Sequence, residues 1–282
     1  MLSRPATDSR RGTARHTPTD SPDRTVGWYL YGVTRRGPLA SAAVEGEPIE
    51  LLDCADLVAV VKPLEVDEFR NDIIQNASRN SAALEAMVYA HNRVIAAIHA
   101  RQEILPAKFG MVYSTPGDIR AAVRASRASL LSNLERLSGC DEFAVHLYAD
   151  VSIVRQRIAD VDTAVQKLRR ECALASPGKA FFVRQQLHSE LEAATARILS
   201  ALAEDAFDRL APCASDASAG ALAPAHIDGE AEILRASFLV RRADVAAFEA
   251  EIRFLGASEH LRCASSGPWP PYSFAARMED PS

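Results

Sequence analysis

The order of hydrophobic and polar positions divides the chain into a polar leader and two series of helices and strands. Residues 1–25 carry almost no apolar side chains and are rich in Ser, Thr, Arg, Asp and Pro. Such a segment cannot offset the entropy cost of ordering by burying apolar surface, so we expect it to be disordered. Order is predicted to begin at residues 27–33 (GWYLYGV), because an aromatic and β-branched run is typical of a buried strand.

The first series mixes short apolar runs with one long amphipathic segment. Over residues 81–101, apolar side chains recur at spacings of three and four, which predicts a helix with one apolar face that includes His91. Thr115, followed by Pro116 and Asp118, is typical of a helix start. The predicted elements are strands at 27–33, 49–52, 57–61 and 109–113 and helices at 81–101 and from Thr115 to Gly139.

The second series begins with a strand in which Phe143, Val145 and Leu147 alternate with polar residues. Asp150 and the Ser176-Pro177 pair each predict a helix start. Small and polar residues over 211–229 predict a long loop. The predicted elements are strands at 142–148, 233–240 and 260–263, helices at 150–168, 176–202 and 244–255, and a closing apolar and proline-rich segment at 267–274.

The strands are few and fall into two groups, which favours two small α+β domains over one doubly wound sheet. The second group resembles a split βαβ, ferredoxin-like arrangement with an extra helix. We place the domain boundary near Gly139. This gives a leader over 1–25, an N-terminal α+β domain over 26–139 and a C-terminal ferredoxin-like domain over 140–282.

Charge and hydropathy exclude two classes of partner. The chain has a net charge of −5, and the leader, with five Arg and three Asp, contributes +2, so the remainder carries −7. A body of that sign repels phosphate backbones, so we expect no nucleic acid partner. No apolar run approaches the ~20 residues that a membrane span needs, and no secretory signal is evident, so we expect a cytoplasmic protein.

Motifs for catalysis, cofactors and metals are absent from the sequence. The five cysteines are far apart and form no CxxC pair, which argues against a disulfide framework or a thiolate metal site. The sequence contains no phosphate-binding glycine motif, no histidine cluster and no nucleophile motif. We therefore expect no enzyme activity and no cofactor, and we interpret His91 as a hydrogen-bonded core or interface histidine.

Two segments are candidates for partner binding. The closing segment, residues 267–274, has a backbone stiffened by prolines, so its aromatic residues either seal the core through Trp269 and Phe274 or serve as docking anchors or a clamp between domains. Lys108 is the only charge in an apolar stretch and either extends from a strand end into water or contacts a partner. The candidate residues are Lys108, Phe109, Gly110, Gly267, Pro268, Trp269, Pro270, Pro271, Tyr272 and Phe274.

Five segments, taken in order, resemble the gas vesicle protein F/L family of accessory proteins. The last of them is the most specific, and together they span nearly the whole chain after the leader. Two features depart from the family pattern: Phe181-Phe182 replaces the usual Tyr-Leu, and the Arg-rich leader is not part of it. The matching segments are 28–33 (WYLYGV), 104–113 (ILPAKFGMVY), 176–182 (SPGKAFF), 238–240 (FLV) and 267–274 (GPWPPYSF).

The resemblance implies a non-catalytic protein with an α+β N-terminal domain and a modified ferredoxin-like C-terminal domain. It also implies contact with the small hydrophobic main shell protein and with other accessory proteins, in the cytoplasm and at the gas vesicle. Covering apolar shell subunits would limit their aggregation. Two alternatives remain open: a ligand-sensing regulatory module, and an enzyme whose site is assembled from distant residues.

We expect residues 1–24 to be dispensable for stability. A chain beginning at Thr25 should keep its melting temperature within about 2 °C of the full-length value, because residues 1–24 are polar, interrupted by prolines and nearly free of apolar side chains. Differential scanning calorimetry of both chains checks this. A larger drop would mean that the leader packs on the folded body.

Overall fold

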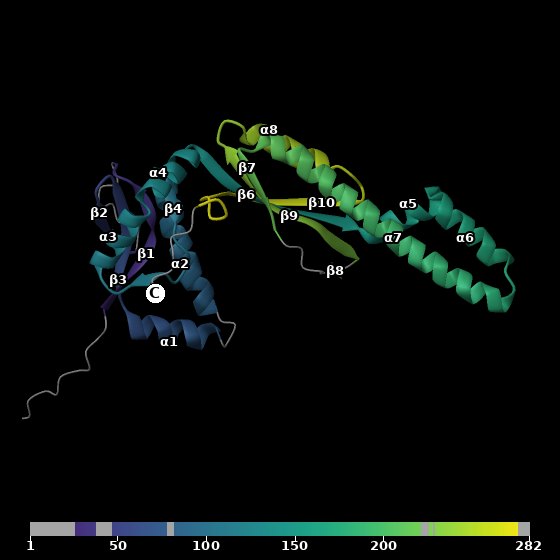
Figure 1. Cartoon of the computed structure of the whole chain (residues 1–282), viewed down its shortest axis with the longest axis horizontal. Helices are drawn as coiled ribbons and strands as arrows, with labels where there is room; N and C mark the ends of the chain where they lie inside the picture. Colours follow the sequence, from purple (N-terminus) through teal and green to yellow (C-terminus); the bar gives the residue numbers. More distant parts are fainter. Residues whose placement is uncertain (1–25, 38–46, 78–81, 221–225, 228, 276–282) are drawn as a thin grey trace, which may run out of the picture.

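The computed structural model describes residues 26–37, 47–77, 82–220, 226–227 and 229–275. The leader over 1–25 lies outside these residues. The described chain forms an α+β fold with two antiparallel sheets, the first at one end of the molecule and the second near its middle (Figure 1). This arrangement confirms the predicted fold class.

The first sheet has the strand order β2-β3-β1-β4, with β5 also paired to β1. The strands predicted at 27–33, 49–52 and 57–61 are confirmed. The strand predicted at 109–113 is wrong over most of its length, because Gly110 adopts a φ of +87° and turns the chain before β5. The strands are β1 (Val26–Arg35), β2 (Glu50–Cys54), β3 (Leu57–Glu65), β4 (Ile104–Pro106) and β5 (Val112–Tyr113).

Four helices accompany this sheet in the described part of the chain. The amphipathic segment forms α2, and its buried stripe packs on the sheet. Thr115 caps α3 through a capping box with Asp118, as its sequence predicts. The helix predicted from Thr115 to Gly139 is interrupted at Ser126, and the helix α1 was not predicted. The helices are α1 (Val66–Ala77), α2 (Ala82–His99), α3 (Pro116–Ala125) and α4 (Arg127–Arg136).

The second sheet has the strand order β10-β6-β9-β7, with β8 paired to β9. Counted along the chain, its four main strands lie in the order fourth, first, third and second, the arrangement of a ferredoxin-like fold. The loop predicted over 211–229 is wrong in part, because β7 pairs with β9 there. The strands are β6 (Cys140–Asp150), β7 (Asp216–Ala219), β8 (His226–Ile227), β9 (Glu230–Arg241) and β10 (Leu261–Trp269).

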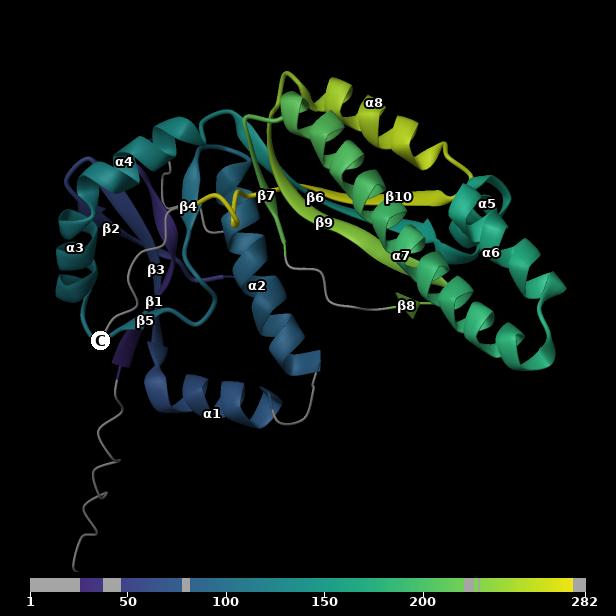
Figure 2. The ribbon, with the colours of Figure 1, turned by 45° about the vertical axis from the view of Figure 1, so that its right-hand side comes forward.

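Three helices replace the first helix of the ferredoxin pattern. The single helix predicted from Asp150 breaks at Asp162, and each aspartate caps the helix that follows it. The C-terminal half of α7 packs on the sheet, while its N-terminal half runs beyond the sheet beside α5 and α6 (Figure 2). We call this projecting three-helix part the arm. The helices are α5 (Val151–Val161), α6 (Thr163–Leu174), α7 (Pro177–Leu210) and, on the sheet, α8 (Val245–Gly256).

One hydrophobic cluster crosses from the first sheet to the second. It joins Leu30 and Leu134 to Cys140, at the start of β6, and to Leu239 of β9. A buried polar contact lies at the same junction, where Asp141 Oδ1 is 2.8 Å from His99 Nε2 and 3.1 Å from Arg242 Nη2. The two sheets are therefore held together by shared apolar packing and by a satisfied buried carboxylate.

The closing segment completes this shared core. Phe274 is only 7% exposed and packs into the cluster that contains the first sheet, whereas Trp269 is 48% exposed. The expectation that both residues plug the second domain is therefore wrong, because Phe274 reaches across the junction and Trp269 faces solvent. Arg136 Nη2 donates to the carbonyl oxygen of Phe274 over 2.5 Å. The segment thus acts as a clamp between the two sheets.

His91 lies on the buried stripe of α2, next to the aromatic rings of the first sheet. Tyr29 Oη is 2.8 Å from His91 Nδ1, and the ring of Tyr31 stacks on the imidazole. Burial lowers the pKa of His91 from 6.5 to about 4, so the folded protein holds it neutral. This is the hydrogen-bonded core histidine that the sequence predicts.

Phe274→Ala should lower the free energy of unfolding by about 3 kcal/mol, because it empties a packed position in the shared core. Trp269→Ala, at the first paired residue after the register shift in β10, is the matched control and should cost less than about 1 kcal/mol because Trp269 is 48% exposed. Urea unfolding of both variants checks the difference. Equal losses would mean that the clamp does not depend on Phe274.

Stability should fall between pH 6.5 and pH 4 because of His91. Its pKa is lower in the folded than in the unfolded chain, so the unfolded chain binds the proton first as the pH falls. The expected loss is roughly 2–3 kcal/mol, complete near pH 4 and absent above pH 7. His91→Gln keeps a hydrogen-bonding side chain that does not titrate, so urea unfolding at a series of pH values should show a shallower pH dependence for this variant.

Candidate functional site

A cleft of about 420 Å³ lies where the closing segment meets α2, at the junction of the two sheets. Clefts where two packed parts of a protein meet are common binding sites. One wall comes from the solvent-facing side of α2, the other from the end of β10 and the turn after it. The lining residues are Tyr89, Asn92, Arg93, Ala96, Glu142, Trp269, Pro270 and Tyr272, and we call this site the aromatic cleft.

The α2 wall follows from the helix period. His91, Val94, Ile95 and Ile98 face the sheet, which leaves Tyr89 and its neighbours one and two turns along on the opposite side. The side chain of Tyr89 is 73% exposed. Sequence analysis missed it, although an aromatic residue outside the buried stripe of an amphipathic helix is a usable signal for a binding surface.

The second wall depends on the path of the closing segment. Gly267 adopts a φ of +144°, and a Cβ atom at this position would lie 2.8 Å from the carbonyl oxygen of Glu142. Only glycine therefore allows the strand to pass so close to β6. Trp269 follows, with its ring half exposed and its Nε1 donating to Ser266 Oγ over 3.2 Å. The sequence-predicted proline frame thus presents a tryptophan to solvent.

The floor of the cleft is polar and fully paired. Glu142 is buried, and its two oxygens accept hydrogen bonds from the backbone N–H and the hydroxyl of Ser273, over 2.8 and 2.6 Å. Tyr272 Oη donates to Asn92 Oδ1 over 3.0 Å. Burial, and then the negative charge of Glu142, raise the pKa of Tyr272, so its hydroxyl stays neutral. With its polar groups satisfied, the cleft offers a partner mainly aromatic surface.

The structure separates the two sequence-predicted segments. Trp269, Pro270 and Tyr272 line the aromatic cleft, Pro271 is buried beside them, and Gly267 and Pro268 form the approach. Phe109 instead lines a second cavity, against another face of α2. Gly110 turns the chain there and donates its N–H to Tyr29 Oη, while the side chain of Lys108 is exposed. The two segments therefore do not form one site.

Among the described residues, no group of three or more His, Cys, Asp or Glu residues is arranged to hold a metal ion. None of the helices in this part of the chain is long and apolar enough to cross a membrane. All five cysteines are free, and burial raises the pKa of the Cys54 and Cys263 thiols.

Curated relatives with similar sequences are gas vesicle proteins. The chain is 28% identical to gas vesicle protein L of Streptomyces sp. (strain CB03234), over 89% of this chain and 94% of that protein. It is 25% identical to gas vesicle protein L1 of Halobacterium salinarum, over 95% of this chain and 98% of that protein. Both matches therefore extend over both sheets.

Two solved structures have the same fold. The crystal structure of the gas vesicle protein GvpF from Anabaena sp. PCC7120 matches with a TM-score of 0.68 at 18% identity and covers 90% of this chain and 99% of that chain. GvpF from Microcystis aeruginosa matches with a TM-score of 0.63 at 16% identity, over 89% and 99% of the respective chains. The family model for the gas vesicle synthesis proteins GvpL and GvpF matches residues 27–276, and this chain therefore belongs to the GvpL/GvpF family.

Proposed function

We propose that this protein is a non-catalytic accessory protein of gas vesicle assembly that binds the hydrophobic main shell protein and other accessory proteins. Its family supports an accessory role at the gas vesicle. The binding of shell subunits, in the cytoplasm and on the growing vesicle, is the part of this proposal that needs testing. The aromatic cleft is the observation that carries it.

The aromatic cleft has the properties of a site for an apolar partner. Tyr89 and Trp269 project from opposite walls and are held by a helix and by a proline-stiffened strand. Rigid aromatic side chains lose little entropy on binding and are common anchors in protein interfaces. The paired polar floor leaves no buried donor or acceptor that a partner would have to satisfy.

Binding of this kind needs no chemical step. Shell subunits expose apolar surface, and a protein that covers this surface reduces aggregation by mass action. Such an effect is stoichiometric, so the amount of protein bound should follow the amount of shell protein. The absence of motifs for phosphate binding or nucleophilic catalysis in the sequence is compatible with this role.

The proposal predicts that the double variant Tyr89→Ser and Trp269→Ser loses shell-protein capture while it remains folded. Loss of two aromatic anchors should reduce the amount of co-precipitated shell protein at least tenfold, because each anchor typically contributes more than about 1 kcal/mol. Co-precipitation from cells that make gas vesicles, together with the urea midpoint of the same variant, checks this.

Phe254→Ser is the matched control, because Phe254 is an exposed aromatic residue on α8, outside the cleft. This variant should capture shell protein as the parent does. Unchanged capture by the cleft variant would contradict the aromatic cleft as the docking site. Recovery of a tightly bound metabolite in place of shell protein would favour the ligand-sensing alternative.

A further inference from the structure

The outer end of the arm exposes large apolar side chains. Leu174, in the last turn of α6, is 88% exposed, and Phe181 and Phe182, in the first turns of α7, are 61% and 66% exposed. The two phenyl rings contact each other edge to face, with centroids 5.6 Å apart. The end of the arm is therefore a convex apolar tip. Such a tip can insert into a cavity of a partner, whereas it has no groove that could receive a peptide segment.

The tip is basic although the chain as a whole is acidic. Over residues 163–188 the sequence has five basic residues against Glu171 as the sole acidic one, a net charge of +4. Glu171 is paired with Lys179 at 3.0 Å. A partner for this tip therefore needs a concave apolar site with an acidic rim. The basic residues, all exposed, are Lys167, Arg169, Arg170, Lys179 and Arg184.

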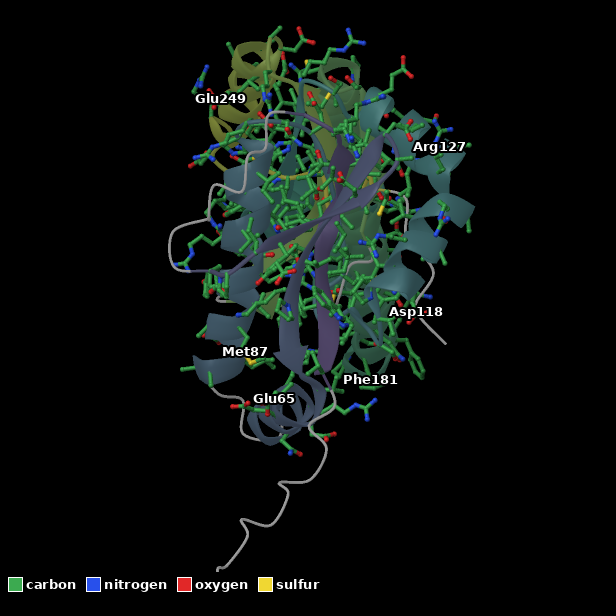
Figure 3. All side chains as sticks on the ribbon, turned by 90° about the vertical axis from the view of Figure 1, so that its left-hand side faces the viewer. Glu65, Met87, Asp118, Arg127, Phe181 and Glu249 are labelled. Carbon is green, nitrogen blue, oxygen red and sulfur yellow. The ribbon has the colours of Figure 1, made fainter. Side chains whose placement is uncertain are left out.

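The N-terminal domain contains a cavity of that kind. It measures about 370 Å³ and is open to solvent between the first sheet, α1 and α2. Its walls are mainly aromatic and aliphatic, and Met87, on the cavity wall, lies near Glu65 and α1 at one end of the domain (Figure 3). We call it the aromatic cavity. Its lining residues include Tyr29, Tyr31, Leu64, Phe69, Met87 and Phe109.

Four of the polar residues that line the aromatic cavity are paired with one another. His91 is bonded to Tyr29, and Lys62 Nζ lies 3.1 Å from Glu47 Oε2. None of these four side chains is left without a partner, so none of them would favour a polar ligand. An apolar side chain therefore suits the cavity best. Asp67 and Glu68, in the first turn of α1, directly precede the lining residue Phe69, and Glu85, in the first turn of α2, directly precedes the lining residue Ala86. These three carboxylates are exposed, as is Arg70 on the other side of Phe69, so the four residues together carry a net negative charge, opposite to that of the arm tip.

We propose that the arm tip of one copy of this chain docks in the aromatic cavity of a second copy. The tip and α1 lie at opposite ends of the molecule in both views, so one chain cannot make the contact with itself (Figures 1 and 2). Two different surfaces take part, which makes the contact heterologous, and repetition of it joins copies in an open row. The contact uses neither Tyr89 nor Trp269, so it is independent of the aromatic cleft.

Analytical ultracentrifugation of the full chain, up to about 100 µM and at low and high salt, tests this proposal. The parent should form species larger than a dimer, and high salt should weaken them. The arm variant Phe181→Ser and Phe182→Ser should be monomeric. The cavity variant Ala86→Trp, which places a large ring at the cavity wall, should be monomeric as well.

Mixing the two variants gives the decisive result. The arm variant keeps an intact cavity and the cavity variant keeps an intact arm, so an equimolar mixture should form a 1:1 dimer and nothing larger. Phe254→Ser, an exposed aromatic residue elsewhere, should assemble like the parent. Thermal melting of each variant confirms that it is folded.

A monomeric parent at all concentrations, assembly that survives both variants, or a mixture that stays monomeric would each overturn the proposal. Sedimentation of a monomeric parent with phosphatidylglycerol vesicles, lost in the arm variant, would instead assign the tip to an anionic lipid surface and would also overturn it. Both variants should still capture shell protein through the aromatic cleft, so a failure here is distinguishable from a failure of the proposed function.

Discussion

The structure depends on one hydrophobic core that is shared by its two sheets. Leu30 and Leu134 of the N-terminal part belong to the same hydrophobic cluster as Leu239 of the second sheet, and Phe274 is buried in this cluster as well. Burial of this surface, rather than the short connection at Gly139, holds the sheets in a fixed relation. The aromatic cleft forms along this seam, so its two walls keep their spacing only while the shared core is packed.

Much of the fold is predictable because its elements have regular periods or clear start signals. The stripe on α2, the capping box at Thr115 and the alternation on β6 all express local rules. The errors occur where tertiary packing decides. β7 consists of small and polar residues, and it forms a strand because its backbone pairs with the free edge of β9. The break at Asp162 depends on packing α5 and α6 back against α7.

The candidate site was predictable in part. The closing segment is unusual enough in sequence to make Pro270 and Tyr272 candidates for a site, but composition cannot tell which of its aromatic residues is buried. Phe274 turned out to be the core residue, and Trp269 the exposed one. Tyr89 lies 180 residues from Trp269, and only the fold brings them to one cleft. Exposure of Phe181 and Phe182 likewise depends on how far the arm extends.

The length of α7 makes the arm a lever. At 1.5 Å per residue, its 34 residues span about 50 Å, and only the C-terminal half is anchored on the second sheet. A rotation of about 10° at that anchor moves the far end by roughly 4 Å, because displacement grows with the free length of the helix. A small rotation of α7 on the sheet would therefore produce a larger displacement of Leu174 and its neighbours at the tip of the arm.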